Sequence, residues 1–305
     1  MRADVTETSQ NSMLKSLRKM FGPEEVAAAP ADGKITLADV LSRGWFELWY
    51  QPKIELRTMQ IYGAEALVRA RHPQRGVLSP GLFLPGASEA DMLALTERVI
   101  ATALRDWNDF AADGLSLKIA VNVPVSALVK LPISTMVREL RPTAESWPGL
   151  IMEVTEDEII GDLKLANNAA AELQAAGCSL ALDDFGAGYS SIARLRQLPF
   201  SELKIDRAYV INCHTDRVNA GLCEVFVELS KRFGLKTVAE GIELTHESHK
   251  LQALGCDIGQ GYLYAKPMPK TELIGAMRRR LVGAPVAVPM PARRLTGLTP
   301  GLGRN

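Results

Sequence analysis

Acidic and amide side chains recur at or just after the short apolar runs of this sequence. Such runs are typical of buried strands, and reactive groups in β/α barrels lie at the carboxyl ends of strands. The polar residues at these positions are Glu65, Asn122, Glu153, Asp183, Asp184, Lys204, Glu240 and Gln260. Several carboxylates in one low-dielectric site repel one another unless cations are bound. Because oxygen donors without clustered histidine or thiolate favour hard cations, the pattern indicates a Mg²⁺ or Mn²⁺ site.

The adjacent pair Asp183 and Asp184 suits a site with two metal ions. One carboxylate could lie between two ions while the other binds the second, as two-metal phosphoryl hydrolysis requires. The competing interpretation is that the pair caps the helix after the glycine-containing turn at residues 185–191. The number of strand ends that carry polar residues favours the metal site.

Lys204 also has two interpretations. A lysine within a strand usually points to solvent. The run at residues 203–206, however, alternates apolar and charged residues, so that Lys204 and Asp206 share one face of the strand. In a closed barrel, the inner end of that charged face would line the site.

The elements that would position these residues alternate along most of the chain. Apolar runs of strand type occupy residues 115–121, 150–154, 179–182, 202–205, 236–239 and 256–258, and helical patterns occupy 89–112, 163–176 and 219–233. This alternation predicts a parallel sheet, either open and doubly wound or closed into a barrel. Seven or eight such units in one domain favour the barrel.

Two segments at the start of the alternation are harder to interpret. Residues 46–56, which contain Tyr50-Gln51-Pro52, are typical of an extra strand before the alternation begins. Residues 63–70 are rich in good helix formers, yet their position requires the first barrel strand, with Glu65 at the site. Local propensity and position in the fold therefore disagree there.

The composition is that of a soluble protein with one large domain. The chain has 305 residues, of which 47% are hydrophobic and 23% charged, and its formal net charge is zero. It therefore has no overall field that would gather nucleic acid or anionic lipid from a distance. The four cysteines form no CxxC pair, and no apolar stretch is long enough to cross a bilayer. We expect a cytoplasmic protein that does not bind nucleic-acid polymers.

Both ends of the chain differ from its centre. Residues 1–33 are polar and then rich in alanine and proline, and residues 282–305 contain prolines, glycines and arginines without an acid. Residues 13–21 have an apolar face beside basic residues, typical of a short amphipathic helix that packs on protein or weakly contacts a membrane. The expected organisation is a flexible segment at 1–33, one domain at 34–281 and a disordered tail at 282–305.

Other kinds of site have little support in the sequence. His246 and His249 could share a helix face, but without a nearby cysteine or third histidine a solvated face is favoured over a zinc site. The sequence contains no GxGxxG after a strand and no GxxxxGK[ST] loop. A glycosidase would need one acid and one base rather than a carboxylate cluster with a lysine.

An ordered set of short motifs runs through residues 36–281. The motifs are Tyr50-Gln51-Pro52, Glu65-Ala66-Leu67-Val68-Arg69, Val121-Asn122-Val123, Glu153-Val154-Thr155-Glu156, Asp183-Asp184-Phe185-Gly186-Ala187-Gly188-Tyr189-Ser190-Ser191, Leu203-Lys204-Ile205-Asp206, Val238-Ala239-Glu240-Gly241-Ile242-Glu243 and Gln260-Gly261-Tyr262. In this order they resemble the EAL-domain family of cyclic di-GMP phosphodiesterases. A set of this length is highly specific.

The resemblance implies an α/β fold, a modified (β/α)8 barrel of the TIM type whose first strand runs antiparallel to the rest. It also implies two bound ions, Mg²⁺ or Mn²⁺. The implied ligands are Glu65, Asn122, Glu153 and Asp183 for the first ion, and Asp183, Asp184 and Glu240 for the second. Lys204 is similar to the family lysine that contacts the attacking water. Glu240 resembles a residue that acts either as a metal ligand or as a base.

The resemblance also implies a substrate pocket. Its implied residues are Gln51, Leu67, Arg69, Asp206 and Gln260. Arg69 suits a phosphate because its guanidinium is a charged fork. Glu156 and Glu243 resemble residues that support the metal ligands from behind, with Glu156 anchoring the loop after the aspartate pair.

The implied activity is hydrolysis of cyclic di-GMP to linear pGpG by two-metal activation of water, in bacterial second-messenger signalling. The implied assembly is a homodimer formed through the region after the aspartate pair. The alternative is a catalytically silent cyclic di-GMP receptor with the same fold, which the intact metal positions disfavour. Two departures from the family pattern, Pro124 for a usual serine and Ser88 for a usual glutamate, remove no metal ligand. The sequence does not determine how these two residues affect strand packing, the pocket rim and substrate affinity.

Overall fold

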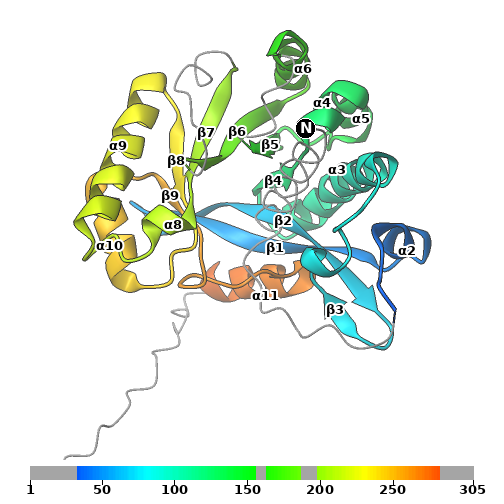
Figure 1. Cartoon of the computed structure of the whole chain (residues 1–305), viewed down its shortest axis with the longest axis horizontal. Coiled ribbons are helices and arrows are strands. Elements are labelled where there is room, and N and C mark those ends of the chain that lie inside the picture. The colour runs from blue at the N-terminus through cyan, green and yellow to red at the C-terminus, as the bar shows by residue number, and fades with distance from the viewer. Residues whose placement is uncertain (1–32, 156–162, 187–197, 282–305) are drawn as a thin grey trace, which may run out of the picture.

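The computed structural model describes residues 33–155, 163–186 and 198–281 (Figure 1). The segments expected to be flexible at 1–33 and disordered at 282–305 lie outside the described residues, except for Gly33. The amphipathic helix expected at 13–21 and Glu156 also lie outside them. The proposed domain boundaries and the role of Glu156 therefore stay predictions.

A closed barrel forms the centre of the molecule, as the alternation of elements predicts (Figure 1). Within the described residues, eight strands close the ring, because the first and last of them also pair with each other. In spatial order they are β1 (Phe46–Glu55), β9 (Ile258–Gly259), β8 (Lys236–Ala239), β7 (Phe200–Ile205), β6 (Cys178–Phe185), β5 (Leu150–Thr155), β4 (Lys118–Asn122) and β2 (Gln60–His72). The short strands β3 (Gly76–Leu78) and β10 (Met268–Pro269) pair with β2 and β1.

The antiparallel strand of the barrel is β1. It pairs antiparallel with both β2 and β9, whereas the other neighbours in the ring are parallel. The expectation of an antiparallel first strand is confirmed in β1. Residues 46–55 form the extra strand expected before the alternation begins, and this strand also closes the barrel. The first barrel strand is therefore β1, and the assignment of residues 63–70 as the first barrel strand is wrong. β2, which carries Glu65, runs parallel to β4.

The segment rich in helix formers is a strand, in agreement with its position in the fold. Residues 63–66 of β2 pair with 118–121 of β4, and the other edge of β2 pairs with β1 along most of its length. All residues from 63 to 70 are buried. Two paired edges and burial on both faces outweigh a helix preference of less than about 1 kcal/mol per residue.

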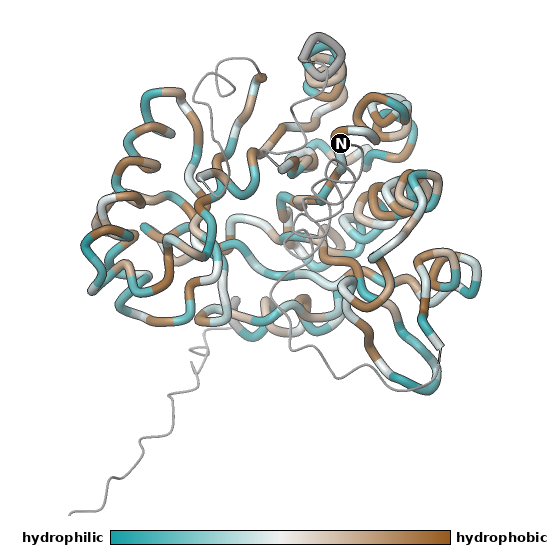
Figure 2. Tube along the Cα trace, in the orientation of Figure 1, coloured by the Kyte–Doolittle hydropathy of each residue, from teal (hydrophilic) through white to brown (hydrophobic). Residues whose placement is uncertain are grey.

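Helices surround the barrel and bury their apolar faces against it (Figures 1 and 2). Their bounds are α2 (Leu37–Ser42), η1 (Pro80–Leu82), α3 (Glu89–Ala112), α4 (Val125–Lys130), α5 (Ile133–Leu140), α6 (Leu163–Ala175), α8 (Arg207–Val210), α9 (Arg217–Phe233), α10 (Thr245–Leu254) and α11 (Lys270–Leu281). The main core lies between strands and helices, with Trp107 and Phe110 of α3 fully buried. A separate small cluster of Ala120, Ile151 and Ala181, with Tyr62 packed against it, includes residues of three neighbouring strands.

All four cysteines are free and buried, which agrees with the absence of a disulfide framework expected from their spacing. Within the described part of the chain, no helix is long and apolar enough to cross a membrane. The cytoplasmic location stays a prediction.

Candidate metal centre

Three carboxylates meet where β6 and β8 end. Asp183 and Asp184 lie near the end of β6 and Glu240 directly follows β8, and each offers an oxygen within 4.8 Å of the others. The backbone N–H of Asp184 donates to the Asp183 carboxylate at 2.8 Å. Asp184 has φ 60°, a left-handed conformation that is uncommon for a residue other than glycine. Such strain is typical of functional sites, where the surrounding structure holds it in place.

Glu65 lies beside this group and is held by two amides. Its carboxylate accepts hydrogen bonds from Asn122 at 2.8 Å and from Gln260 at 2.6 Å. Because Asn122 donates through its nitrogen, its amide oxygen remains the atom suited to bind a cation. β2 therefore contributes to the site from its interior, where its pairing with β4 ends, and β4 and β9 contribute at or just after their last residues.

Lys204 is the centre of the cluster. Its ammonium group, 1% exposed, donates to Glu153 at 2.7 Å and to Asp183 at 3.1 Å, and it pairs with Glu240 at 2.7 Å. The interpretation of Lys204 as an inward-facing residue is confirmed, and the solvent-facing alternative is wrong. The ammonium group of Lys204 thus contacts carboxylates that lie on or directly after three different strands.

The charges of this cluster depend on one another. Burial by itself would lower the pKa of Lys204, but the surrounding carboxylates, led by Asp183 and Glu153, raise that pKa well above its ordinary value. Burial by itself would raise the pKa of Glu153, but the ammonium groups of Lys204 and Lys53 outweigh it and lower that pKa to about 2. Both groups are therefore charged at neutral pH.

Glu65 and Glu240 behave in the opposite way. Burial raises the pKa of Glu65, and the nearby Glu153 carboxylate adds to this effect, while Lys204 opposes it. Desolvation likewise raises the pKa of Glu240 well above its ordinary value, with Asp183 adding to the shift. The protein alone thus disfavours full ionisation of the cluster, which is the condition that bound cations relieve.

Lys53 of β1 belongs to the site and was missed in the sequence. Its ammonium group is fully buried, donates to Glu153 at 2.5 Å and lies 3.6 Å from Glu202. The signal was present, because Lys53 lies two residues after Gln51 and strand alternation puts both on one face. As an extra strand before the alternation, residues 46–56 carry no expectation of an inward face.

A cleft of about 390 Å³ opens beside the cluster. Predicted site residues that line it are Gln51, Glu65, Leu67, Asp206, Glu240, Glu243 and Gln260. Gln51 accepts a hydrogen bond from Gln260 at 3.0 Å, and Asp206 caps α8 by accepting from the N–H of Ala208 at 2.7 Å. The structure thus brings these residues of distant segments to one surface.

Arg69 is not among the described residues that line the cleft. It is buried on β2, donates to the carbonyl of Val68 at 2.7 Å and lies with its guanidinium 5.9 Å from the centre of the Trp49 ring. Strand alternation still puts Arg69 on the same face as Glu65 and Leu67. Its contact with phosphate stays a prediction.

The cleft rim is held by a buried glutamate that the sequence did not reveal. Glu247, 1% exposed, accepts hydrogen bonds from the backbone N–H groups of Asn212, Glu243 and Leu244. Glu243 itself pairs with Arg207 at 2.5 Å across the rim. Glu243 therefore contacts α8 across the rim, and its role in supporting the metal ligands stays a prediction. A glutamate near a helix start carries no distinctive sequence signal.

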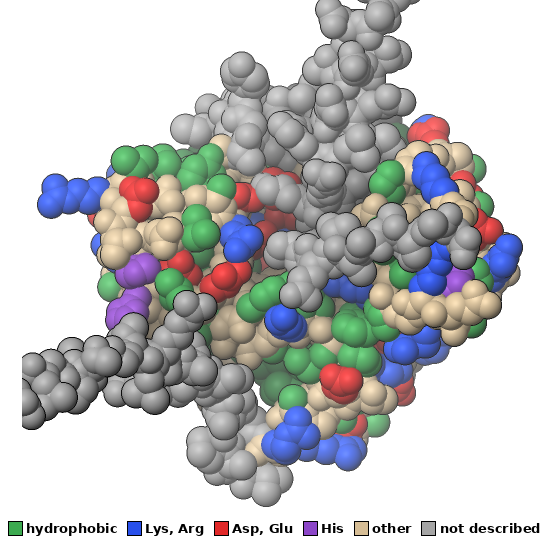
Figure 3. Space-filling view, turned by 60° about the horizontal axis from the view of Figure 1, so that its bottom comes forward, with side chains coloured by type: hydrophobic (Ala, Val, Ile, Leu, Met, Phe, Trp, Pro, Cys, Tyr) green, Lys and Arg blue, Asp and Glu red, His purple; other side chains and the backbone are tan. Residues whose placement is uncertain are grey.

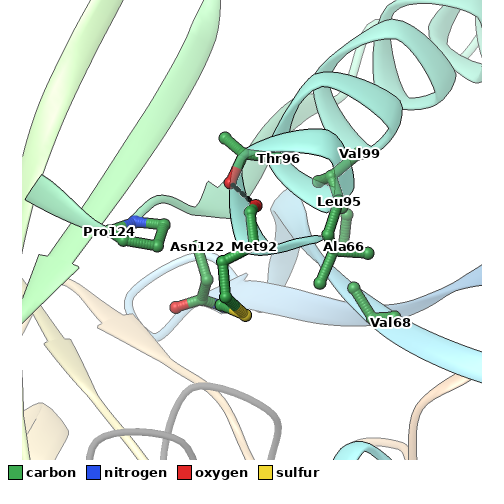
Figure 4. Close-up of a pocket in the computed structure, with 8 residues that line it drawn as sticks. All are labelled: Ala66, Val68, Met92, Leu95, Thr96, Val99, Asn122 and Pro124. Carbon is green, nitrogen blue, oxygen red and sulfur yellow. Dashed lines mark hydrogen bonds between the residues drawn. The ribbon is translucent and has the colours of Figure 1, made fainter. Parts of the chain in front are cut away.

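The two departures from the family pattern have local structural roles. Ser88 caps α3, because its hydroxyl accepts from the N–H of Asp91 at 3.1 Å. Pro124 precedes α4 and borders a cavity of about 10 Å³, where it and Asn122 face Met92 and Thr96 of α3 (Figure 4). The cavity has room for about one water molecule, so it is a packing defect rather than a ligand site.

The donor set fits a hard divalent cation. Carboxylate and amide oxygens from several strand ends converge, and the described residues contain no histidine or cysteine in a cluster that could hold a metal. His246 stacks on His214 instead, with ring centres 5.6 Å apart. Oxygen-only donors favour Mg²⁺ or Mn²⁺ over softer metals.

The fold and this site define a β/α-barrel protein with an acidic, oxygen-rich centre at the carboxyl ends of its strands. The chain belongs to the EAL domain family, whose model matches residues 35–267.

Curated relatives support this membership. The chain is 35% identical over 259 residues to the cyclic di-GMP phosphodiesterase RocR of Pseudomonas aeruginosa, covering 84% of this chain and 66% of RocR. It is 36% identical over 245 residues to the bifunctional diguanylate cyclase/cyclic di-GMP phosphodiesterase MucR of the same organism, covering 79% of this chain and 36% of MucR. The chain thus spans from about a third to just under two thirds of the length of these relatives.

Solved structures share the fold. The PaMucR phosphodiesterase in complex with c-di-GMP matches with a TM-score of 0.70 and 35% identity, covering 78% of this chain and 97% of that one. An EAL domain protein from Listeria monocytogenes EGD-e matches with a TM-score of 0.69 and 27% identity, covering 82% of this chain and 99% of that one.

Proposed function

We propose that this chain is a divalent-metal-dependent phosphodiesterase that hydrolyses cyclic di-GMP to linear pGpG. The observation that carries the proposal is the cluster of oxygen donors around Lys204, next to a cleft of about 390 Å³. That volume is in the range of small-molecule sites. The name of RocR and the ligand of PaMucR support cyclic di-GMP as the substrate.

The metal site would be built from two overlapping sets of ligands. Glu65, Asn122, Glu153 and Asp183 would hold one ion, and Asp183, Asp184 and Glu240 would hold a second. The proximity of the oxygens of Asp183, Asp184 and Glu240 supports the second set and favours Glu240 as a ligand over a free base. Bound Mg²⁺ or Mn²⁺ would supply Lewis-acid activation of the phosphate and of water.

Lys204 would act through its fixed positive charge. Because its pKa is raised well above the ordinary lysine value, it stays protonated and cannot serve as a general base at neutral pH. An ammonium group at this position would stabilise negative charge on the attacking water oxygen and on the phosphate. Removing that charge would slow hydrolysis without removing a metal ligand.

The cleft residues would hold the dinucleotide. Gln51 and Gln260 offer amide groups, Leu67 offers an apolar surface, and Asp206 offers a carboxylate that can accept from a guanine N–H. We include Arg69 as a phosphate contact on the grounds of its position on β2. Attack of water on phosphorus then releases the 3′ oxygen of one ribose and opens the ring.

The test is turnover of cyclic di-GMP by purified protein with Mg²⁺ or Mn²⁺, followed by separation of the nucleotides. We expect pGpG from the unchanged chain and none from Glu65→Gln, because that change removes a carboxylate from the first ion. Glu228→Gln, an exposed glutamate on α9, is the matched control and should retain full activity. Full activity of Glu65→Gln would contradict the proposed metal site.

The silent-receptor alternative gives a different result in the same assay. A receptor would bind cyclic di-GMP tightly without producing pGpG. No contact in the described residues favours it, because the predicted metal ligands among them lie together with Lys204.

We further propose a homodimer that uses α9, which follows the aspartate pair in the chain. Val218 and Val225 lie seven residues apart on this helix and are 69% and 59% exposed. Light scattering should show a dimer that Val218→Glu/Val225→Glu converts to a monomer, because charges in an apolar interface are costly. Leu140→Glu, at an exposed apolar residue on α5, should leave the dimer intact. A monomeric unchanged chain would contradict the proposal.

A further inference from the structure

Lys53 is an ammonium group without access to solvent. It lies on β1 opposite Gly63, two residues before Glu65 on β2, and therefore one layer deeper in the barrel than the metal centre. Its side chain is 0% exposed, as is the side chain of Glu153, its closest partner. The small apolar cluster of the barrel strands includes Ala120, which is the register partner of Glu65 and therefore lies at the level of the metal centre. A charge at this depth is costly unless it is well paired.

The partners of Lys53 are two carboxylates. It donates to Glu153 at 2.5 Å and lies 3.6 Å from Glu202, which in turn accepts from the hydroxyl of Tyr62 at 2.8 Å. Lys53 therefore connects the metal centre with a polar group deeper in the barrel.

Glu153 divides its two oxygens between two lysines. Oε1 accepts from Lys53 and Oε2 accepts from Lys204. Lys204 also reaches Asp183 and Glu240, so its charge is shared among three carboxylates, of which Glu240 lines the cleft. Among the hydrogen bonds and ion pairs of the described residues, none joins Lys53 to Asp183 or Glu240. Its positive charge therefore compensates the negative charge of Glu153 from the deeper side of the barrel.

We propose that Lys53 is a resident counter-ion of the metal centre, which stabilises the barrel without metal and weakens metal binding. The proposal rests on the metal site proposed above. In the metal-free protein, Lys53 supplies positive charge that Glu153 and its neighbours require. When a cation binds at Glu153, the same positive charge lies close to it and repels it. Lys53 is thus a positioning residue, which acts through Glu153.

The proposal predicts effects of unequal size on the metal-free and metal-bound states of the protein. Loss of the Lys53 charge should destabilise the metal-free state and should destabilise the metal-bound state less, because the cation takes over the compensation of Glu153. The increase in melting temperature on metal addition should therefore grow, and the Kd for metal should fall. A residue that only fills space would change both states equally and leave this difference unchanged.

The experiment compares Lys53→Met/Glu202→Gln with Glu202→Gln alone. Both variants lack the Glu202 carboxylate, so that substitution of Lys53 does not leave a buried charge at residue 202 without its partner. The two variants therefore differ only at residue 53. Melting temperatures are measured with and without Mn²⁺, and Mn²⁺ affinity is measured by calorimetry. Lys53→Gln is a second variant, which removes the charge but keeps a hydrogen-bond donor.

We expect the double variant to bind Mn²⁺ with a Kd about tenfold lower than that of Glu202→Gln, together with a larger melting shift. A variant that folds only when Mn²⁺ is present would be the extreme form of the same result. An equal or weaker affinity and an equal or smaller shift would overturn the proposal. Failure of both Lys53 variants to fold even with Mn²⁺ would also overturn it, because metal would then be unable to replace the lysine.

The outcome is separable from that of the proposed function. If the unchanged chain binds Mn²⁺ but does not hydrolyse cyclic di-GMP, the proposed function fails and the counter-ion proposal can still be judged by affinity and melting. If the chain hydrolyses cyclic di-GMP but the variants show no difference in metal response, only the counter-ion proposal fails.

Discussion

Glu153 between its two lysines shows how single residues control the charge of this site. The ammonium groups keep it ionised at neutral pH, whereas the raised pKa values of Glu65 and Glu240 favour protonation of those carboxyls. Carboxyl groups in one cluster are thus shifted in opposite directions, because Glu153 contacts two ammonium groups, whereas burial and neighbouring carboxylates dominate at Glu65 and Glu240. The dependence of the protein's stability on pH follows from these opposite pKa shifts.

Metal-free protein should lose stability as the pH rises above about 4.5, the ordinary pKa of glutamate. Above that pH the unfolded chain releases protons that native Glu65 and Glu240 retain, so the native state becomes relatively less stable. Mn²⁺ binds the ionised carboxylates, and its stabilising effect should therefore be larger at about pH 8 than at about pH 6. Thermal melts at both pH values, with and without Mn²⁺, measure the difference. A metal-induced shift that shrinks with rising pH would contradict the assignment of these residues.

Glu153 contributes with the opposite sign and in another pH range. Its folded pKa of about 2 is below the ordinary value, so its stabilising contribution is present above about pH 4.5 and is lost as the pH falls toward 2. The two ranges do not overlap, and an acid melt can separate the two effects.

At the residue level, the sequence predicts the side chains at strand ends better than those deeper in the barrel. Glu65, Asn122, Asp183, Lys204 and Glu240 meet because the ends of neighbouring strands lie at one face of a barrel, a rule that needs no coordinates. Lys53 and Glu202 could not be assigned in this way. Their pairing depends on which residues of β1 and β7 share a depth, and that depends on the strand register across the whole ring.

At the level of elements, β1 and β2 show where local patterns are insufficient. The alternation predicts most strands and helices, and α3 (Glu89–Ala112) and β8 (Lys236–Ala239) begin and end as expected. The place of β1 in the ring depends on hydrogen bonds with β9, whose residues are about 200 positions away in the chain. No local pattern contains that information, so the sequence predicts a strand at residues 46–56 but not its place in the ring.

Gly63 and Gly221 should respond oppositely to alanine. A Cβ on Gly63 would lie 2.2 Å from the carbonyl oxygen of Lys118 in the neighbouring strand, and backbone would have to move. We expect Gly63→Ala to lower the free energy of unfolding by about 3 kcal/mol. Gly221 is exposed within α9, and a Cβ there meets no atom within 4 Å, so Gly221→Ala should stabilise by about 1 kcal/mol.

Urea unfolding of both glycine variants measures these changes. Equal effects of the two substitutions would mean that the close approach of β2 and β4 is not as described. Because β2 carries Glu65, Gly63→Ala should also weaken metal binding, and Gly221→Ala should not.

At the level of the whole molecule, charge is balanced. The formal net charge is zero, and acidic and basic side chains are intermixed on the face shown in Figure 3. An anionic dinucleotide would therefore be captured by local groups and bound metal rather than by a long-range field.

The association rate of cyclic di-GMP should therefore change by less than about twofold between low and physiological salt. Stopped-flow binding at several salt concentrations measures the rate. Arg69→Ala should weaken binding to a similar extent at each concentration, because the lost contact is local. A steep fall in association rate with moderate salt would show that long-range steering matters after all.

The reversed direction of β1 changes how the chain enters the face of the barrel that carries the acidic cluster. In a parallel barrel, each strand arrives at the catalytic face with its last residues and passes into a loop. β1 instead enters at that face, with Phe46 opposite Ala70, and runs inward past Gln51 to Lys53. α2 (Leu37–Ser42) precedes it by only a few residues. One continuous strand therefore connects the segment after α2 with Gln51, which lines the cleft, and with the buried ammonium group of Lys53.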